Sequence, residues 1–426
     1  HQSRAGTAGS GEPLSGGAAM SPESTRTRKR HDGSLGSTSS DEVEPRLPSC
    51  LLRRCGCFRA HRGVIADPRP LPTALSAPCP SLLLVRQRQQ LRVPAHRRGV
   101  DGHGLLGEQA IQRVAIARIG DDSDFTEFGG NNGAPFAPNR QCAWFKNVLT
   151  APDQLRQRVA FALSELFVVS DESLGQQFTY GLANYYDLLG AGAFGNFRTL
   201  LENVTLSPIM GVYLSSLRNA KGTFNDKGVA LTSADENYAR EVMQLFTIGL
   251  NRLQPDGTLK LDASGLPIPT YDKKTISEMA KIFTGWAFQS ADANSAGNFR
   301  GSAANYLRPM MLYPAFHDTT AKTIVGGVVI PANQTGAQDL KDALDTLFNH
   351  PNTGPFIARQ LIQRLVTSNP SPGYIYRVAQ TFANNGAGVR GDLGAVVRAI
   401  LLDYEARSAT VAASPSFGKL KEPLLR

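Results

Sequence analysis

The sequence is poor in the residues that build compact metal sites and disulfide frameworks. Residues 121–426 contain one cysteine, Cys142, and two histidines, His317 and His350. A single thiol cannot form an internal disulfide, and two imidazoles cannot supply a three-histidine zinc site. Any serine–histidine–aspartate triad in this part of the chain must therefore use one of these two histidines.

Long apolar runs are absent as well. A membrane-spanning helix needs roughly 18 or more apolar residues, and a secretory signal needs a basic segment followed by an apolar one. Neither pattern occurs, so we predict no integral membrane segment. The chain begins with His1 and stops at Arg426 inside a charged, leucine-rich stretch. We therefore expect both ends to be cut and the helical domain to be truncated at its C-terminus.

Aromatic residues are almost missing from the first 120 residues, where Phe58 is the only one of the chain's 33. The same 120 residues contain 18 basic and 9 acidic side chains, which accounts for the whole net charge of +9. Residues 121–426 contain 27 of each sign. A neutral domain has no electrostatic attraction to a polyanion, so we expect no nucleic acid as its partner.

We assign residues 1–138 to an aromatic-poor segment rich in Arg, Pro, Gly and Ser. Apolar residues recur there with neither the period of a strand nor that of a helix, and such a chain buries too little apolar surface to offset its ordering entropy. One interpretation is a disordered basic arm, densest at Arg26–Arg30. The other, which we favour, is that GC-rich DNA was translated out of frame.

Residues 139–426 predict a mainly α fold: a multi-helix globular domain with a small β-hairpin insertion and a few short strands. Capping boxes at Ser233–Glu236 and Thr275–Glu278, and Pro208 after Ser207, mark helix starts. We predict helices at about 150–169, 178–190, 195–205, 208–218, 234–249, 276–287, 336–349, 355–367, 372–384 and 392–403. Turn residues within 251–272 predict the hairpin, and 308–332 predicts a short strand or two.

Two stretches match the pattern Gly-x-Gly-x-x-Gly, namely Gly190–Gly195 and Gly386–Gly391. A dinucleotide loop needs a preceding parallel strand, a helix start at the pyrophosphate and an acid about 20 residues later. Both stretches instead follow predicted helices, so we interpret them as turns between helices. Metalloprotease, nucleophile-elbow and P-loop motifs are absent from residues 121–426, and the sequence identifies no cofactor.

Glu165 is the charged residue that is hardest to explain. The residues three and four positions away along its predicted helix are all apolar, so it has no partner on that helix. A buried carboxylate must be paired from elsewhere or protonated. Two interpretations remain: a general acid or base with a raised pKa, or a structural ion pair with an arginine such as Arg240 or Arg359, which we favour.

Two further groups are candidates for chemistry. Glu236, Arg240 and Glu241 belong to the polar face of the predicted helix 234–249, where a solvated ion pair between Glu236 and Arg240 is the simpler explanation. His317 and Asp318 are adjacent in a predicted loop and could act as a base and its orienting acid, or as two metal ligands. A surface loop is the simpler expectation for this pair.

Several long strings resemble the bacterial domain of unknown function 1800 family. They are Arg158–Ser170, Asp235–Gly249, Thr275–Trp286, Asn349–Leu365 and Gly388–Leu393, in this order along the chain. The resemblance covers about residues 140–426. It implies a largely helical bacterial protein, exported in many members and encoded beside a second uncharacterised family. The implied localisation is periplasmic or extracellular, and the implied partner is a second exported protein encoded nearby.

The resemblance supplies no catalytic residue, and two hypotheses follow. The first, which we favour, is a non-catalytic scaffold or partner protein of the cell envelope or of an exported complex. The second is an exported hydrolase-like enzyme that uses buried carboxylates with a histidine–aspartate pair. Convergence of Glu165, Arg240 and His317 on one pocket would favour the enzyme.

Retranslation of the gene tests the frame hypothesis for the aromatic-poor segment. We expect one of the two other frames to encode a helical, aromatic-containing sequence over this segment. Absence of such a sequence from both frames would refute the frame hypothesis and favour the disordered arm.

Overall fold

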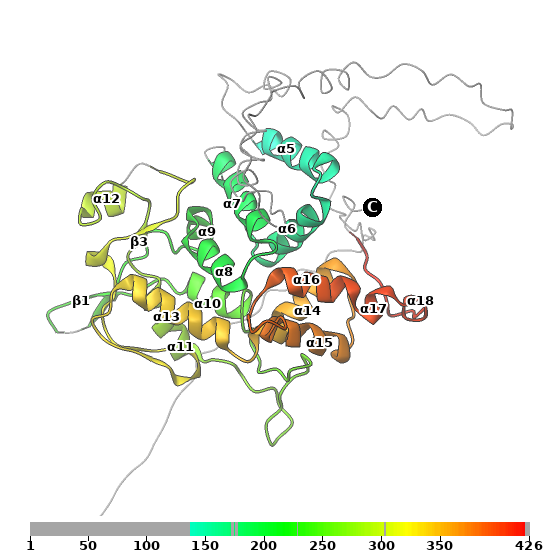
Figure 1. The fold of residues 1–426 in the computed structure, drawn as a ribbon. Helices are drawn as coiled ribbons and strands as arrows, with labels where there is room; N and C mark the ends of the chain where they lie inside the picture. Colours follow the sequence, from blue (N-terminus) through cyan, green and yellow to red (C-terminus); the bar gives the residue numbers. More distant parts are fainter. Residues whose placement is uncertain (1–136, 172–173, 175–177, 228, 302–303, 422–426) are drawn as a thin grey trace, which may run out of the picture. The chain divides into compact units, whose positions relative to one another are not determined.

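The computed structural model describes residues 137–171, 174, 178–227, 229–301 and 304–421. All of them belong to one compact unit, residues 99–426. The predicted segment 1–138 therefore lies almost entirely outside the described residues. The mainly α fold is confirmed, because helices dominate this part of the chain and the strands are short and paired in twos (Figure 1).

The described residues form fourteen α-helices. Five precede the irregular middle of the chain: α5 (Ala137–Thr150), α6 (Gln154–Leu166), α7 (Thr179–Gly192), α8 (Phe197–Leu206) and α9 (Pro208–Tyr213). Three lie within it: α10 (Asn237–Gln244), α11 (Lys273–Ile282) and α12 (Ala296–Gly301). Six follow it: α13 (Gly336–Asn349), α14 (Thr353–Leu365), α15 (Pro372–Ala383), α16 (Leu393–Leu402), α17 (Tyr404–Arg407) and α18 (Ala409–Ala412). None of the described helices is long and apolar enough to cross a membrane.

One hydrophobic core joins helices that are far apart in the sequence. Its rings form a chain from Phe246, after α10, through Phe167, after α6, to Phe197 on α8 and Phe382 on α15, with centroids 5.3, 6.1 and 5.5 Å apart. All four rings are fully buried. Because burial of each large ring stabilises the fold by roughly 1.5–3 kcal/mol, this chain holds the early and late helices together.

The strands of the described residues form three short antiparallel pairs. They are β1 (Thr223–Phe224) with β2 (Ala230–Thr232), β3 (Trp286–Ala287) with β4 (Met311–Leu312), and β5 (Lys322–Thr323) with β6 (Val329–Ile330). The predicted hairpin insertion at 251–272 is an arm of three short segments joined by isolated bridges, such as Leu253 with Leu259 and Leu261 with Pro267. Most of the predicted strand at 308–332 is irregular backbone around β4, β5 and β6.

Several helix predictions were wrong at their ends, among them the one at 150–169, where α6 spans only Gln154–Leu166. The helix predicted at 208–218 stops at Tyr213, because Ser215 and Arg218 adopt positive φ angles that interrupt helical hydrogen bonding. The helix predicted at 234–249 is shortened to α10, and its cap residue Glu236 makes no side-chain capping bond. Helix α11 begins earlier than the predicted residue 276, because the carboxylate of Asp272 accepts the Thr275 N–H and caps it, and it ends at Ile282 instead of 287.

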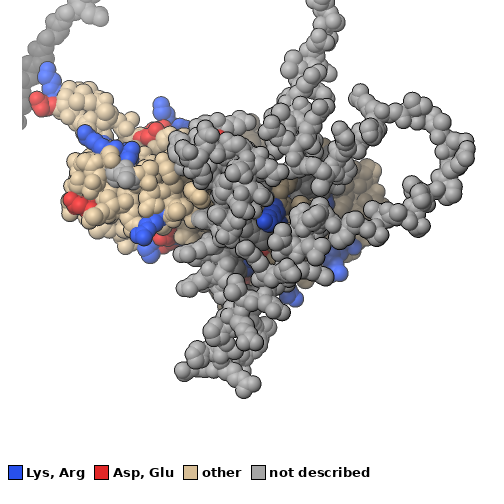
Figure 2. All heavy atoms as spheres, turned by 90° about the horizontal axis from the view of Figure 1, so that it is seen from above, with Lys and Arg blue, Asp and Glu red and all other residues tan. Residues whose placement is uncertain are grey.

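Figure 2 shows one face of the molecule, with lysine and arginine side chains interspersed with acidic ones on the described surface at the left of the view. Mixed signs of this kind agree with the balanced charge of residues 121–426. The described part of that face therefore has no large region of a single sign.

Candidate functional site

Glu165 lies in the last turn of α6, where its side chain is half-buried. The arginine beside this turn is Arg364 of α14, whose Nη2 donates a 3.1 Å hydrogen bond to the Glu165 carbonyl oxygen. Of the two arginines predicted as partners, Arg240 pairs with Glu236, and Arg359 donates to the Gly257 carbonyl oxygen. Arg364 therefore ties the end of α6 to α14.

Glu236, Arg240 and Glu241 line the partly exposed face of α10, as predicted for an amphipathic helix. Oε2 of Glu236 lies 3.3 Å from Arg240 Nη2, and its Oε1 accepts a hydrogen bond from Ser277 of α11. Burial raises the pKa of Glu241, and the positive charge of Arg240 opposes this shift. These groups lie on a surface network between α10 and α11.

His317 is not on a surface loop, which corrects the simpler expectation for this residue. Only 1% of it is exposed, and its Nε2 lies 3.0 Å from Oδ2 of Asp339 on α13. Gly285, at φ +84°, lets the chain approach this closely, because a Cβ there would stand 3.0 Å from the His317 backbone nitrogen. Its neighbour Asp318 instead accepts hydrogen bonds from the backbone and hydroxyl of Thr320.

Lys322 and Asp339 complete a buried charged centre that the sequence analysis missed. Lys322 Nζ lies 2.7 Å from Asp339 Oδ2, and Gln334 Nε2 donates to the other carboxylate oxygen at 3.1 Å. Burial alone would raise the pKa of Asp339, but hydrogen bonds from His317, Lys322 and Gln334 and the lysine charge leave it below its ordinary value. A signal did exist, because Asp339 lies on the apolar stripe of its helix, four residues before Ala343.

This centre has the composition of a structural ion pair. Both the lysine ammonium and the carboxylate are buried, and each is hydrogen-bonded to protein groups. Within the described ranges, no three His, Cys, Asp or Glu side chains gather where they could hold a metal ion. The centre therefore offers neither access for a substrate nor a set of metal ligands.

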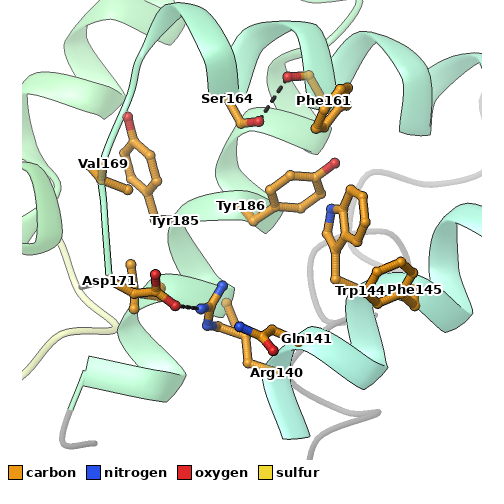
Figure 3. Close-up of a pocket in the computed structure, with 12 residues that line it drawn as sticks. Arg140, Gln141, Trp144, Phe145, Phe161, Ser164, Val169, Asp171, Tyr185 and Tyr186 are labelled. Carbon is orange, nitrogen blue, oxygen red and sulfur yellow. Dashed lines mark hydrogen bonds and ion pairs between the residues drawn. The ribbon is translucent and has the colours of Figure 1, made fainter. Parts of the chain in front are cut away.

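An open cavity lies instead between α5, α6 and α7 (Figure 3). Its volume is about 410 Å³. Four of its lining residues are polar, namely Arg140, Gln141, Ser164 and Asp171. The others are aromatic or aliphatic: Trp144, Phe145, Phe161, Val169, Leu182, Ala183, Tyr185 and Tyr186. We call this cavity the aromatic pocket. None of the six site residues predicted from the sequence lines it.

The geometry of the aromatic pocket depends on Trp144. Its indole contacts the rings of Phe161 and Tyr186 at centroid distances of 5.8 and 6.2 Å, and so joins all three helices. Burial raises the pKa of Tyr186 to about 12, so its hydroxyl stays protonated at neutral pH. An ion pair between Arg140 and Asp171 closes one side of the cavity (Figure 3).

The family comparison agrees with the motif resemblance. A family model described as a protein of unknown function, DUF1800, matches residues 87–426. The chain belongs to the DUF1800 family. No curated protein and no solved structure matches the chain. The DUF1800 match includes residues 87–138, so family membership extends into the aromatic-poor segment.

The DUF1800 motifs coincide with core elements. Four strings contain most of α6, α10, α11 and α14, and the fifth forms the turn before α16. Gly391 in that turn has a φ of +75°, and a Cβ there would lie 2.6 Å from the Phe348 ring. These motifs are therefore explained by packing and backbone conformation, and none of them contains a residue of the aromatic pocket apart from Phe161, Ser164 and Val169.

His350 forms the C-cap of α13, and its Nδ1 accepts a 3.1 Å hydrogen bond from the Asn352 backbone. Burial, together with the positive charges of Arg252 and Lys260, lowers the pKa of His350 to about 4. The imidazole is therefore neutral in the folded protein at neutral pH.

We expect Asp339→Asn to lower the free energy of unfolding by about 3–5 kcal/mol, because it leaves Lys322 buried without its counter-charge. Urea unfolding at pH 7 measures this loss. The matched control is Asp262→Asn, which keeps an acceptor oxygen in an exposed turn. The double variant Asp339→Asn with Lys322→Met should recover part of the loss. If Asp339→Asn lowered the free energy of unfolding as little as the control Asp262→Asn does, a structural role for the centre would be contradicted.

The depressed pKa of His350 predicts that stability rises with pH between about 4 and 6.5. In this interval the unfolded histidine binds a proton that the folded one does not, so the slope from this group is at most about 1.4 kcal/mol per pH unit. Urea unfolding across the interval should give a shallower slope for His350→Gln than for the parent chain. Identical slopes would exclude His350 as the source.

Proposed function

We propose that this chain is a binding protein that docks a partner protein through the aromatic pocket. The observation that carries this proposal is the composition of the pocket, in which Trp144, Tyr186 and Arg140 meet in one open cavity. Tryptophan, tyrosine and arginine are the residues that dominate binding energy at protein interfaces, because they bury large areas and keep a polar end. Membership of a cell-envelope or exported complex, implied by the family resemblance, is part of the proposal.

The surface beside the pocket supports a protein as the occupant. Phe145 and Leu149 are one turn apart on α5, and their side chains are 43% and 76% exposed. Leu155 at the start of α6 is also exposed. These exposed apolar side chains lie next to a cavity of about 410 Å³. The combination suits an apolar segment of a partner protein that places one or two of its side chains in the cavity. The pair Arg140–Asp171 provides polar contacts at the edge.

The positions of the candidate carboxylates favour this proposal over the hydrolase. Glu236 bonds to both Arg240 and Ser277, and His317 is buried beside Asp339. Glu165 lies on α6 next to Ser164, yet it is not a lining residue of the aromatic pocket. An acid–base mechanism needs such groups on one accessible site.

Site-specific photo-crosslinking in the native host tests the docking surface. A photoreactive amino acid in place of Phe145 should give one dominant crosslink to a second protein. The same substitution at Tyr376, which is similarly exposed on α15, is the matched control and should give none. Trp144→Ala should reduce the crosslink from position 145 at least about tenfold, which is the loss typical of an interface hot spot. Equal crosslinks from both positions would refute the proposed surface.

A second arm of the experiment addresses the hydrolase. The purified protein is assayed for hydrolysis of ester and glycoside substrates. If the Glu165 carboxylate is catalytic, Glu165→Gln should abolish any such activity and leave the thermal stability unchanged. Under the binding proposal, Glu165→Gln leaves the crosslink from position 145 intact.

A further inference from the structure

A second cavity borders the other side of α7 from the aromatic pocket. Its volume is about 850 Å³, within the range of small-molecule sites. The walls come from α7, α8, the start of α9 and residues 307–309. Among the described residues none lines both cavities, although Tyr186 of the aromatic pocket directly precedes Asp187 of this one. We call it the amide cavity, after the asparagines on its walls.

The polar side chains of the amide cavity are largely available to a ligand. Asn184, Thr199 and Asn203 make no side-chain hydrogen bond to another described residue, and Arg308 makes no ion pair within the described ranges. Asn196 differs, because its side chain bonds to Arg390 and Arg198 backbone atoms and caps α8. Amide, hydroxyl and guanidinium groups that make no hydrogen bond to described residues can instead bond to a polar ligand in the cavity.

We propose that the amide cavity binds a neutral polyhydroxylated molecule of the sugar class. Each sugar hydroxyl both donates and accepts, and so do the side chains of asparagine and threonine. The described lining gathers no cluster of like charges, which suits a ligand without net charge. Leu307, which is 48% exposed, gives part of the wall an aliphatic surface for the C–H groups of a sugar ring.

Other ligand classes fit the cavity less well. A phosphate ligand is held by clustered cations or by convergent backbone amides, whereas the described lining residues include one arginine and several neutral amides. Part of the glycine pattern at 190–195 lines the cavity, since Gly192 and Gly195 are wall residues. This turn joins α7 to α8 and follows no strand, as predicted, so the dinucleotide requirement of a preceding parallel strand is not met.

Isothermal titration of the purified chain with maltose, cellobiose and chitobiose, and with NADH as a comparison, tests the proposal. At least one disaccharide should bind and NADH should not. Asn203→Ala and Arg308→Ala should each weaken that binding at least about tenfold, because each removes hydrogen bonds that the site offers. The matched controls are Asn237→Ala and Arg398→Ala, which change exposed residues on α10 and α16.

The outcomes separate this site from the proposed docking function. Trp144→Ala should leave disaccharide affinity unchanged, because Trp144 does not line the amide cavity. Binding of NADH but of no disaccharide, binding of none of the probes, or equal weakening by the cavity and control variants would each overturn the proposal. Thermal melting of every variant shows whether it is folded, and retention of the parental melting temperature is expected since Asn203 is exposed.

Discussion

The buried contact between Lys322 and Asp339 is the constraint on which the arrangement of the central elements depends. Two charges taken out of water must be paired, since the penalty for a lone buried ion is several kcal/mol. The carboxylate comes from α13 and the ammonium from β5, while His317 reaches it from the chain after β4. His317 is in turn bonded to Thr284 at the end of α11. Four segments must therefore meet at one point, which sets the position of α13 beside α11.

Helices whose ends are determined locally could be predicted closely, and the others could not. Helix α13 occupies the predicted residues because Thr335 accepts the Gln338 N–H at its start and the chain turns at His350. By contrast, α10 ends at Gln244, and the next residues turn to bury Phe246 against Phe167. That burial is a tertiary interaction between residues about 80 positions apart, so no capping pattern near α10 reports it.

The same distinction explains the outcome for the predicted site residues. His317 was expected on a surface loop, and adjacency in sequence suggested Asp318 as its acid, but that carboxylate bonds locally to Thr320. The acid it meets, Asp339, lies 22 residues further along the chain. An acidic residue on the apolar stripe of an amphipathic helix indicates a buried ion pair, yet it does not identify the partner. The aromatic pocket was beyond prediction for a related reason, because three helices must pack before Trp144 and Tyr186 meet.

Helix α7 separates the two cavities, and its sequence shows how one helix can serve both. Successive residues on a helix point about 100° apart, so Tyr185 and Tyr186 line the aromatic pocket while Asn184 and Asp187 line the amide cavity. Coupling between two sites requires an element whose position both ligands influence. A partner side chain against Tyr186 and a sugar against Asn184 would press on opposite faces of this helix. If both proposed ligands bind, α7 is therefore the element that both of them contact.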